Sequence, residues 1–331
     1  MKYDATLYKL AHLRYITIVK TVYNQEKLVM KNKILLLAII GIIFSCNKDE
    51  NTINPTPENP ELLILPIVVH IIHGGENIGQ GSNLSTERIK EQIRSLNDDF
   101  RRKKGTLGEN NSPISDDSFI QFKLTEVTPN GNPTNGITRI NYFENIPDKD
   151  VNDRPHDWLP KIAYWNPEKY INVWVYGGFP QDQLLGLATI PTTNLPGLEA
   201  PLQALGDGIM INALHFGKSD MDSGANLGKT LTHEMGHFLG LFHVWGRYEG
   251  KGCQQQDDHI QDTAPVAGPI DNCDNPPLAC DGKIAPVNNY MNITYDKCLN
   301  VFTKEQIKRM RYVLENAARR KNLTSSNTID R

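Results

Sequence analysis

One short segment constrains this chain more than any other feature of its sequence. Residues 232–243 read Thr-His-Glu-Met-Gly-His-Phe-Leu-Gly-Leu-Phe-His. His233 and His237 stand four residues apart, so on an α-helix their imidazoles lie on one face, one turn apart. Two imidazole nitrogens placed in this way can bind the same zinc ion. The segment therefore predicts a helix, from about Ala225 to Leu239, that carries two metal ligands.

A third ligand is predicted at His243, six residues beyond His237. A straight helix would carry His243 out of reach, but Gly240 lets the helix end and the chain turn sharply, because glycine tolerates positive φ. Three protein ligands leave a fourth position for water, which is the catalytic arrangement for zinc. Glu234, directly after the first ligand, is then the candidate general base that takes a proton from this water.

The alternative interpretation of this segment is a buried helix whose histidines are incidental. Two histidines spaced around a glutamate are moderately common by chance, but Gly240 and His243 make the pattern far more specific. Three of the nine histidines fall on ligand positions within eleven residues. We therefore favour the metal site.

The amino-terminal region has the pattern of an export signal. A short basic stretch precedes eleven apolar residues, Ile34–Phe44, which are followed by Ser45-Cys46. Such a run is too short for a comfortable transmembrane helix and is typical of a signal peptide. We interpret residues 30–46 as a lipoprotein signal with a lipidated Cys46, the alternative being a plain signal peptide. Residues 1–29 are interpreted as a misassigned upstream extension, or else as an unusually long basic region.

The remaining chain is predicted to form one domain behind a tether. Residues 47–61 are polar and proline-rich, which is typical of an extended linker. Residues 62–322 are predicted to be the folded domain and residues 323–331 a C-terminal tail. Residues 62–72 form a mostly apolar run whose second half, from Ile67, is predicted to be a buried strand. Hydrophobic periodicity predicts further strands at residues 119–127, 169–176, 184–190 and 208–211, and helices at residues 85–101 and 303–320. This order fits an α/β upper half above a loop-rich lower half.

The cysteines support an exported protein. Apart from Cys46, all four remaining cysteines lie within a 46-residue stretch, Cys253–Cys298, in and just after a long irregular segment. Four cysteines allow three pairings, and the residues alone do not choose between them. Disulfides suit an oxidising compartment, whereas no pair has the two-residue spacing expected of zinc-binding thiols. The net charge of -3 argues against a nucleic-acid partner.

The zinc segment matches the pattern HExxHxxGxxH, and the chain therefore resembles the metzincins. Met291, in Asn289-Tyr-Met-Asn, is the candidate for the methionine of their Met-turn, rather than an ordinary buried methionine. More narrowly, the chain is similar to the pappalysins. That resemblance covers residues 62–318, through Ile67-Val-Val-His, Leu96-Asn-Asp-Asp-Phe-Arg, Thr134-Asn-Gly-Ile, Gly252-Cys, Asp262-Thr and Phe302-Thr-Lys-Glu-Gln. It implies a mixed twisted sheet with the active-site helix above a disulfide-stapled lower subdomain.

The same resemblance implies several site residues beyond the zinc ligands. It implies disulfides Cys253–Cys280 and Cys273–Cys298. It implies calcium in the loop 257–263, with Asp258, Asp262 and Thr263 as candidate ligands, because clustered oxygen donors suit a hard cation; the alternative is a solvated acidic loop. It also implies that Asp296 lies in the pocket for the residue after the scissile bond and favours Arg or Lys there, the alternative being a surface aspartate.

One residue departs from the family pattern. Relatives often carry a tyrosine two residues after the Met-turn methionine, but this chain has Ile293, whose side chain cannot donate a hydrogen bond, and Tyr295 lies two residues further on. The predicted function is a zinc endopeptidase that acts on proteins or peptides outside the cell. It would be secreted, or held at the outer membrane or cell surface by the lipid anchor alone. The alternatives are a surface lipoprotein that binds a partner through a structural zinc site, and a zinc amidase for cell-wall peptides.

Overall fold

The structure, a computed structural model, describes residues 60–145, 155–177, 184–202, 206–220, 224–246, 253, 258–271 and 273–330. The predicted signal with Cys46, the extension 1–29 and nearly all of the tether lie outside these residues. No helix in the described part of the chain is both long and apolar enough to cross a bilayer.

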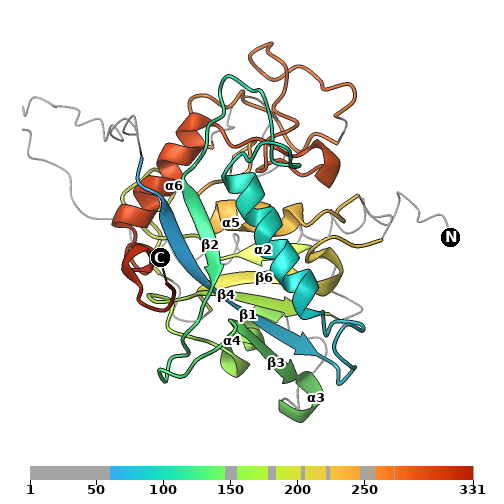
Figure 1. Cartoon of the computed structure of the whole chain (residues 1–331). Helices are drawn as coiled ribbons and strands as arrows, with labels where there is room; N and C mark the ends of the chain where they lie inside the picture. Colours follow the sequence, from blue (N-terminus) through green and yellow to red (C-terminus); the bar gives the residue numbers. More distant parts are fainter. Residues whose placement is uncertain are drawn as a thin grey trace, which may run out of the picture. The chain divides into compact units, whose positions relative to one another are not determined.

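A twisted sheet of six strands forms the centre of the domain (Figure 1). Its strand order is β2-β1-β4-β6-β5, and β3 also pairs with β1. The strands are β1 (Leu63–His73), β2 (Ile120–Leu124), β3 (Ile137–Asn141), β4 (Ile171–Tyr176), β5 (Gly186–Ala188) and β6 (Gly208–Asn212). Every pairing is parallel except that of β5 with β6. The prediction of a mixed α/β fold is confirmed.

Strand β1 organises the sheet because three other strands pair with it. One edge pairs with β2 over residues 63–67 and with β3 over residues 69–73, while the other edge pairs with β4. All residues from Leu65 to Ile72 are buried. A parallel strand covered on both faces is expected to be a continuous apolar run. This is why β1 was predictable, whereas β3, which has no fully buried residue, was not predicted.

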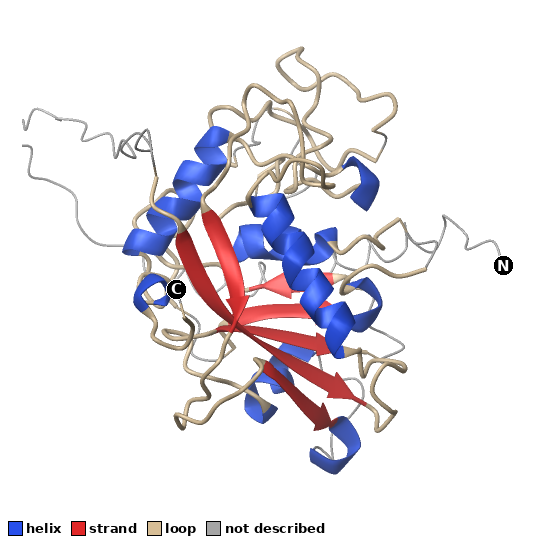
Figure 2. Cartoon of the chain, viewed as in Figure 1, coloured by secondary structure: helices blue, strands red, loops and turns tan. Residues whose placement is uncertain are grey.

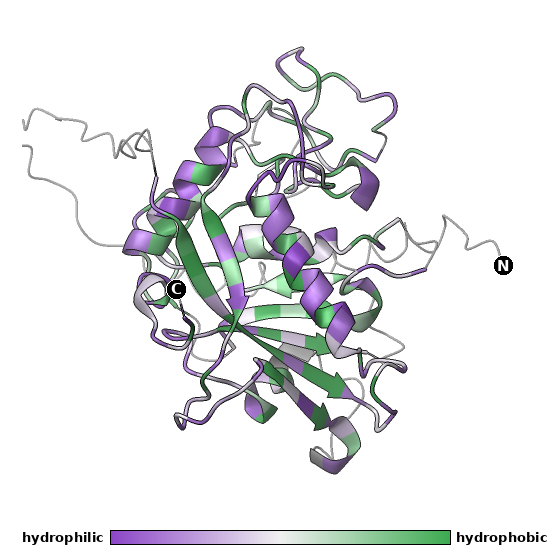
Figure 3. Cartoon of the chain, viewed as in Figure 1, coloured by the Kyte–Doolittle hydropathy of each residue, from purple (hydrophilic) through white to green (hydrophobic). Residues whose placement is uncertain are grey.

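Helices cover both faces of the sheet (Figures 1 and 2). In β4, Val173 and Val175 join the core under α2 (Thr86–Phe100) and α5 (Lys229–Phe238). The alternate residues Trp174 and Tyr176 pack on the opposite face with Trp158 of α4 (Pro155–Ile162). Hydrophobic residues dominate the strands, while the exposed sides of α2 and α6 are hydrophilic (Figure 3). Alternation along each strand thus divides the interior into two cores.

The remaining helices are short or lie near the end of the chain. The four-residue helix α3 (Tyr142–Asn145) follows β3 directly. The last long helix, α6 (Lys304–Asn316), begins with a capping box in which Thr303 and Gln306 satisfy each other's backbone N–H groups. Likewise, Ser85 caps α2 by accepting a hydrogen bond from the Arg88 backbone N–H at 3.2 Å.

The described residues between α5 and α6, which form the lower half, contain little regular structure. Disulfides join Cys253 to Cys280 and Cys273 to Cys298, with Cα–Cα distances of 5.5 and 5.9 Å, in the pairing that the family resemblance implies. Buried Asn292 acts as a further crosslink. Its Nδ2 donates to the carbonyl oxygens of Ile270 and Val287, and its Oδ1 accepts from the Ile270 backbone N–H. Side chains thus replace the backbone ladder here.

Two predicted boundaries differ from the structure. The helix expected from about Ala225 begins only at Lys229, because Gly228 has a φ of 81° that does not continue a helix. The described residues 323–330 of the predicted tail do not hang free. Leu323 is fully buried, and the Thr328 carbonyl oxygen accepts a hydrogen bond from the backbone N–H of Glu126 at 2.8 Å. The C-terminal residues are therefore part of the domain.

Candidate metal centre

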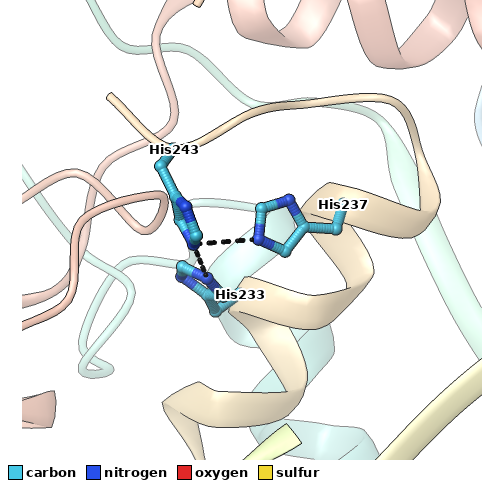
Figure 4. Close-up of side chains that lie close together, drawn as sticks. All are labelled: His233, His237 and His243. Atoms are coloured by element: carbon cyan, nitrogen blue, oxygen red, sulfur yellow. Dashed lines mark hydrogen bonds between the residues drawn. The ribbon is translucent and has the colours of Figure 1, made fainter. Parts of the chain in front are cut away.

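The three predicted zinc ligands lie together in the structure (Figure 4). His233 and His237 project from one face of α5, and the chain turns back at Gly240, which has a φ of 92°. A Cβ atom at Gly240 would also lie 2.8 Å from Cγ2 of Val313. Both the conformation and the space therefore require glycine at this position. The turn returns His243 to the other two histidines.

The imidazole nitrogens of this group converge on one point. The Nε2 atom of His243 lies 3.2 Å from Nε2 of His233 and 3.2 Å from Nε2 of His237. Within the described residues, this is the group of histidine, cysteine and acidic side chains whose spacing suits a metal ion. Its composition, three histidines, is that of a catalytic zinc site with an open fourth position.

Backbone carbonyl groups hold two of the rings in the orientation that metal binding needs. The Nδ1 of His233 lies 2.7 Å from the Tyr290 carbonyl oxygen, and the Nδ1 of His237 lies 2.8 Å from the Leu241 carbonyl oxygen. A carbonyl oxygen only accepts, so each Nδ1 carries the hydrogen and each Nε2 presents a lone pair. Two such lone pairs are thus directed at the Nε2 atom of the third ring, an arrangement that favours a cation between the three nitrogens, and the residues therefore fit zinc.

Burial keeps these histidines neutral. It lowers the pKa of His233 to about 3 and that of His237 to about 4, and it lowers the pKa of His243 well below its ordinary value. The neighbouring histidine rings act in the same direction for His233 and His243. Neutral imidazole is the form that binds a metal ion. The site is thus ready for metal across the neutral pH range.

The Met-turn candidate lies directly beneath α5. Met291 is fully buried, and its backbone N–H donates to Oδ1 of Asn289 at 2.9 Å. A Cβ atom at Gly236 of α5 would collide with Sδ of Met291. The Met291 carbonyl oxygen also accepts from the backbone N–H of Val244, at 3.2 Å. The segment therefore supports both α5 and the irregular segment after Gly240 that carries His243.

Glu234 lies between α5 and the edge strand β5. Its side chain is buried, and burial raises its pKa to about 8. No cationic side chain among the described residues forms an ion pair with it. A Cβ atom at Gly186 of β5 would lie 2.7 Å from its Cγ atom. The raised pKa means that this carboxylate, once ionised, has a high affinity for a proton, which is what a general base needs.

The side of α5 that faces away from Glu234 holds a polar cluster that the sequence did not reveal. Lys229 forms a buried ion pair with Asp99 of α2, and the Thr232 hydroxyl donates to the same carboxylate at 2.6 Å. The Lys229 ammonium also lies 5.5 Å from the ring centre of Tyr290. Burial raises the pKa of Asp99 above its ordinary value. In the sequence, the only sign of this cluster was the pair Asp98-Asp99 inside a predicted helix, and that pair alone does not indicate which residues Asp99 contacts.

Asp296, which follows the Met-turn candidate in the chain, is buried against the amino-terminal end of α5 rather than exposed. Its Oδ2 atom accepts from the backbone N–H groups of Leu227 at 2.7 Å and Lys229 at 3.2 Å. Burial raises its pKa above the ordinary value. Nearby, Ile293 packs partly buried against the core, while Tyr295 is 53% exposed and lies against Gly224. Neither Ile293 nor Tyr295 belongs to the histidine group.

The structure brings together part of the predicted calcium loop. The Thr263 hydroxyl donates to Oδ2 of buried Asp258 at 2.7 Å. Asp262 instead faces α6, where its Oδ2 accepts from the backbone N–H of Glu305 at 3.0 Å. The Oδ1 atom of Asp262 is buried without a hydrogen-bond partner. Asp257 lies outside the described residues.

Comparisons with known proteins agree with this geometry. Residues 159–315 match the family model described as pregnancy-associated plasma protein-A. An extracellular metalloprotease of Arthroderma benhamiae is 37% identical over 131 residues, covering 39% of this chain and 42% of that protein. An extracellular metalloprotease of Uncinocarpus reesii is 33% identical over 238 residues, covering 72% and 71%. The chain thus spans about two fifths of the Arthroderma protein and over two thirds of the Uncinocarpus protein.

A solved structure extends the likeness to the whole fold. Mature mirolysin of Tannerella forsythia, in complex with a cleaved peptide, superimposes with a TM-score of 0.66 at 31% identity. The alignment covers 82% of this chain and 100% of the mirolysin chain. Sequence, fold and the three-histidine group lead to the same conclusion. The chain belongs to the pappalysin-type metzincins, a family of zinc metalloendopeptidases.

Proposed function

We propose that this chain is a zinc-dependent endopeptidase that hydrolyses peptide bonds of extracellular proteins or peptides. The observation that carries the proposal is the convergence of three Nε2 atoms on one point, with Glu234 next to His233 in sequence, in a chain that belongs to a metalloprotease family. A site that only holds zinc for structure needs no general base. Glu234 therefore favours catalysis over a purely structural metal.

The residues divide the chemistry between them. His233, His237 and His243 would hold the zinc ion, which when bound would act as a Lewis acid toward water and the scissile carbonyl group. Glu234 accepts the proton of the attacking water, because its buried carboxylate gains from becoming neutral. The same carboxyl group then donates this proton to the departing amine. Its position beside β5 places the base close to the edge of the sheet.

The edge strand β5 is the proposed site for the substrate backbone. Among the described residues it pairs with β6 alone, and it is the last strand in the sheet order. An extended peptide can add to such an edge through backbone hydrogen bonds. The mirolysin structure, which was solved with a cleaved peptide, gives a related protein in which a peptide is bound.

A preference for Arg or Lys after the scissile bond is proposed from Asp296. Its carboxylate is only 3% exposed and is held by two backbone N–H groups at the start of α5. A fixed, buried carboxylate gains most from a cationic partner that reaches it. Cleavage of a peptide library should therefore concentrate before Arg and Lys, and Asp296→Asn should reduce this preference.

Calcium is proposed for the loop that contains Asp258, Asp262 and Thr263. The support is the buried Oδ1 of Asp262, which has no hydrogen-bond partner and could bind a hard cation. Zinc-loaded protein should bind calcium in a titration, and Asp262→Asn should weaken that binding. A titration that shows no calcium binding would mean that these side chains only form hydrogen bonds within the loop and to the start of α6.

Export of the protein is supported by relatives that are named extracellular metalloproteases. The lipid anchor at Cys46, the signal at residues 30–46 and the extension 1–29 remain proposals from the sequence. Mass spectrometry of the mature protein would identify its first residue and any attached lipid.

The decisive test of the proposed activity is the Glu234→Ala variant of the zinc-loaded protein. Peptide cleavage should fall by at least about a thousandfold, because the variant lacks the general base. Zinc content and unfolding temperature should stay close to those of the wild type. Glu199→Ala, which removes an exposed glutamate, is the matched control.

A second candidate function is a surface lipoprotein that binds a partner and turns over little substrate. Its support is Ile293, which packs against the core and offers no hydrogen bond. Wild-type protein that binds one zinc ion but cleaves no peptide would favour this candidate. Ile293→Tyr would then be the first substitution to make.

A further inference from the structure

Strand β5 passes so close to Glu234 that residue 186 has no room for a side chain. A Cβ atom at Gly186 would lie 2.7 Å from Cγ and 3.0 Å from Oε1 of Glu234. On the sheet side it would lie 2.9 Å from Cδ1 of Ile211. A methyl group in this place needs about 3.4 Å or more from its neighbours, so something must move.

The requirement for glycine here is one of space and not of backbone conformation. Gly186 lies in extended strand and, unlike Gly228 and Gly240, is not among the glycines with positive φ. Alanine could adopt the same backbone without strain. The effect of a substitution would therefore report on contact with Glu234 and Ile211.

The backbones of β5 and α5, on the two sides of this contact, cannot move freely. Pairing of Gly186 with Ile211 and of Ala188 with Ile209 ties β5 to the sheet, and the Asn212 backbone N–H donates to the Leu185 carbonyl oxygen at 3.0 Å. On the other side, the ion pair of Lys229 with Asp99 holds α5 against α2. The softest element is the Glu234 side chain itself, which can change its rotamer.

We propose that Gly186 is a positioning residue that sets the place of the Glu234 carboxylate next to the edge strand. The inference rests on the proposed function, because it assigns Glu234 as the general base and β5 as the substrate edge. The absence of a Cβ atom lets the carboxylate lie against the strand. A side chain at residue 186 displaces that carboxylate while leaving the backbone N–H and C=O groups of the strand unchanged.

Kinetics of Gly186→Ala separate positioning from substrate binding. The value of kcat should fall by about tenfold or more, because displacing a catalytic group by a fraction of an ångström costs rate. KM should change by less than about threefold, since the strand backbone is retained. Bound zinc should stay at the wild-type level. Gly268→Ala is the matched control, because Gly268 is not among the glycines with positive φ and a Cβ atom added there would meet nothing within 4 Å.

A double-mutant cycle tests the contact without relying on turnover. Gly186→Ala should lower the unfolding temperature of the wild type more than that of Glu234→Ala, because the second background lacks Cγ and the carboxylate. If the single variant does not fold, recovery of folding in the double variant gives the same answer. Equal losses in both backgrounds, or wild-type kcat in Gly186→Ala, would overturn the proposal. A wild-type protein without turnover would defeat the proposed function, whereas the cycle would still decide whether Gly186 positions Glu234.

Discussion

The two halves of this domain are held together in different ways. In the sheet half, β1, β4 and β6 are joined by backbone hydrogen bonds, and their residues are almost entirely buried. In the loop half, residues 240–303, such ladders are largely replaced by two disulfides and by buried side chains such as that of Asn292. The three histidines proposed as zinc ligands come from both halves: His233 and His237 lie on α5, and His243 follows the turn.

This difference shows what each half contributes to the site. The sheet half holds α5 and Glu234 rigidly against β5. The loop half supplies His243, Met291 and Asp296, whose positions depend on irregular backbone. In the loop half, the disulfides and the Asn292 hydrogen bonds take over the role of backbone pairing. The backbone there can therefore follow a path that is neither helix nor strand. Substitutions in the two halves should therefore differ in how far their effects spread.

The largest effect is expected from the buried ion pair in the sheet half. Lys229→Met leaves the Asp99 carboxylate buried without its cation, since both side chains are 1% exposed. The free energy of unfolding should fall by about 3–5 kcal/mol, measured by denaturant titration. The exposed pair of Lys283 and Asp281 provides the control, and Lys283→Met should change the free energy of unfolding far less than Lys229→Met does.

The double variant Lys229→Met/Asp99→Asn decides whether the charge causes this loss. It removes both charges and keeps an acceptor for the Thr232 hydroxyl, so part of the stability should return. Loss in the double variant equal to the sum of the single losses would mean that packing of the Lys229 side chain is the cause.

A slightly smaller effect, confined to the loop half, is expected from Cys273→Ser/Cys298→Ser. This disulfide closes a loop with a sequence separation of 25 residues, so its loss should cost about 3.5 kcal/mol on the loop-entropy estimate. Hydrogen exchange should become faster around Asp296 and Met291, while the amides of β1 and β4 keep their protection. Equal loss of protection in β4 would show that the halves unfold as one unit.

The zinc ligands were predictable from sequence because their geometry is local. The helix repeat and Gly240 place His233, His237 and His243 within eleven residues of chain, and the Nε2 distances agree with that prediction. The strands with continuous apolar runs were likewise predictable. The pairing of the disulfides came from family resemblance, because the cysteine spacing allowed three choices.

The contacts that sequence reasoning missed join distant parts of the chain. Asp99 and Lys229 are 130 residues apart, and no periodic pattern links them. Gly186 is an unremarkable strand glycine until Glu234 is placed against it. Strand β3 was missed because its five residues are all only partly buried, so it lacks the apolar run that marked the other strands. Contacts between residues that are far apart in the sequence can therefore be identified only from the three-dimensional structure.

The smallest predicted effect is a pH dependence that belongs to the sheet half. His70 of β1 is fully buried, and its Nε2 lies 3.1 Å from Oδ1 of Asn172, so Nε2 carries the hydrogen. The Thr138 hydroxyl, 2.7 Å away, can then donate to Nδ1. Burial lowers the pKa of His70 from 6.5 to about 4. The folded protein thus keeps this imidazole neutral at a pH where the unfolded chain protonates it.

Because the unfolded state binds the extra proton, stability should decrease as the pH falls from 6.5 toward about 4 and should lose nothing more from His70 below that. The loss over this window is about 3 kcal/mol. Denaturant titrations of metal-free wild type and His70→Gln, with His73→Gln on the same strand as the control, measure it by difference. The wild type should lose more stability than His70→Gln across this window. Parallel curves for these two proteins would mean that acid acts elsewhere, with the metal-free ligand histidines as the next groups to test.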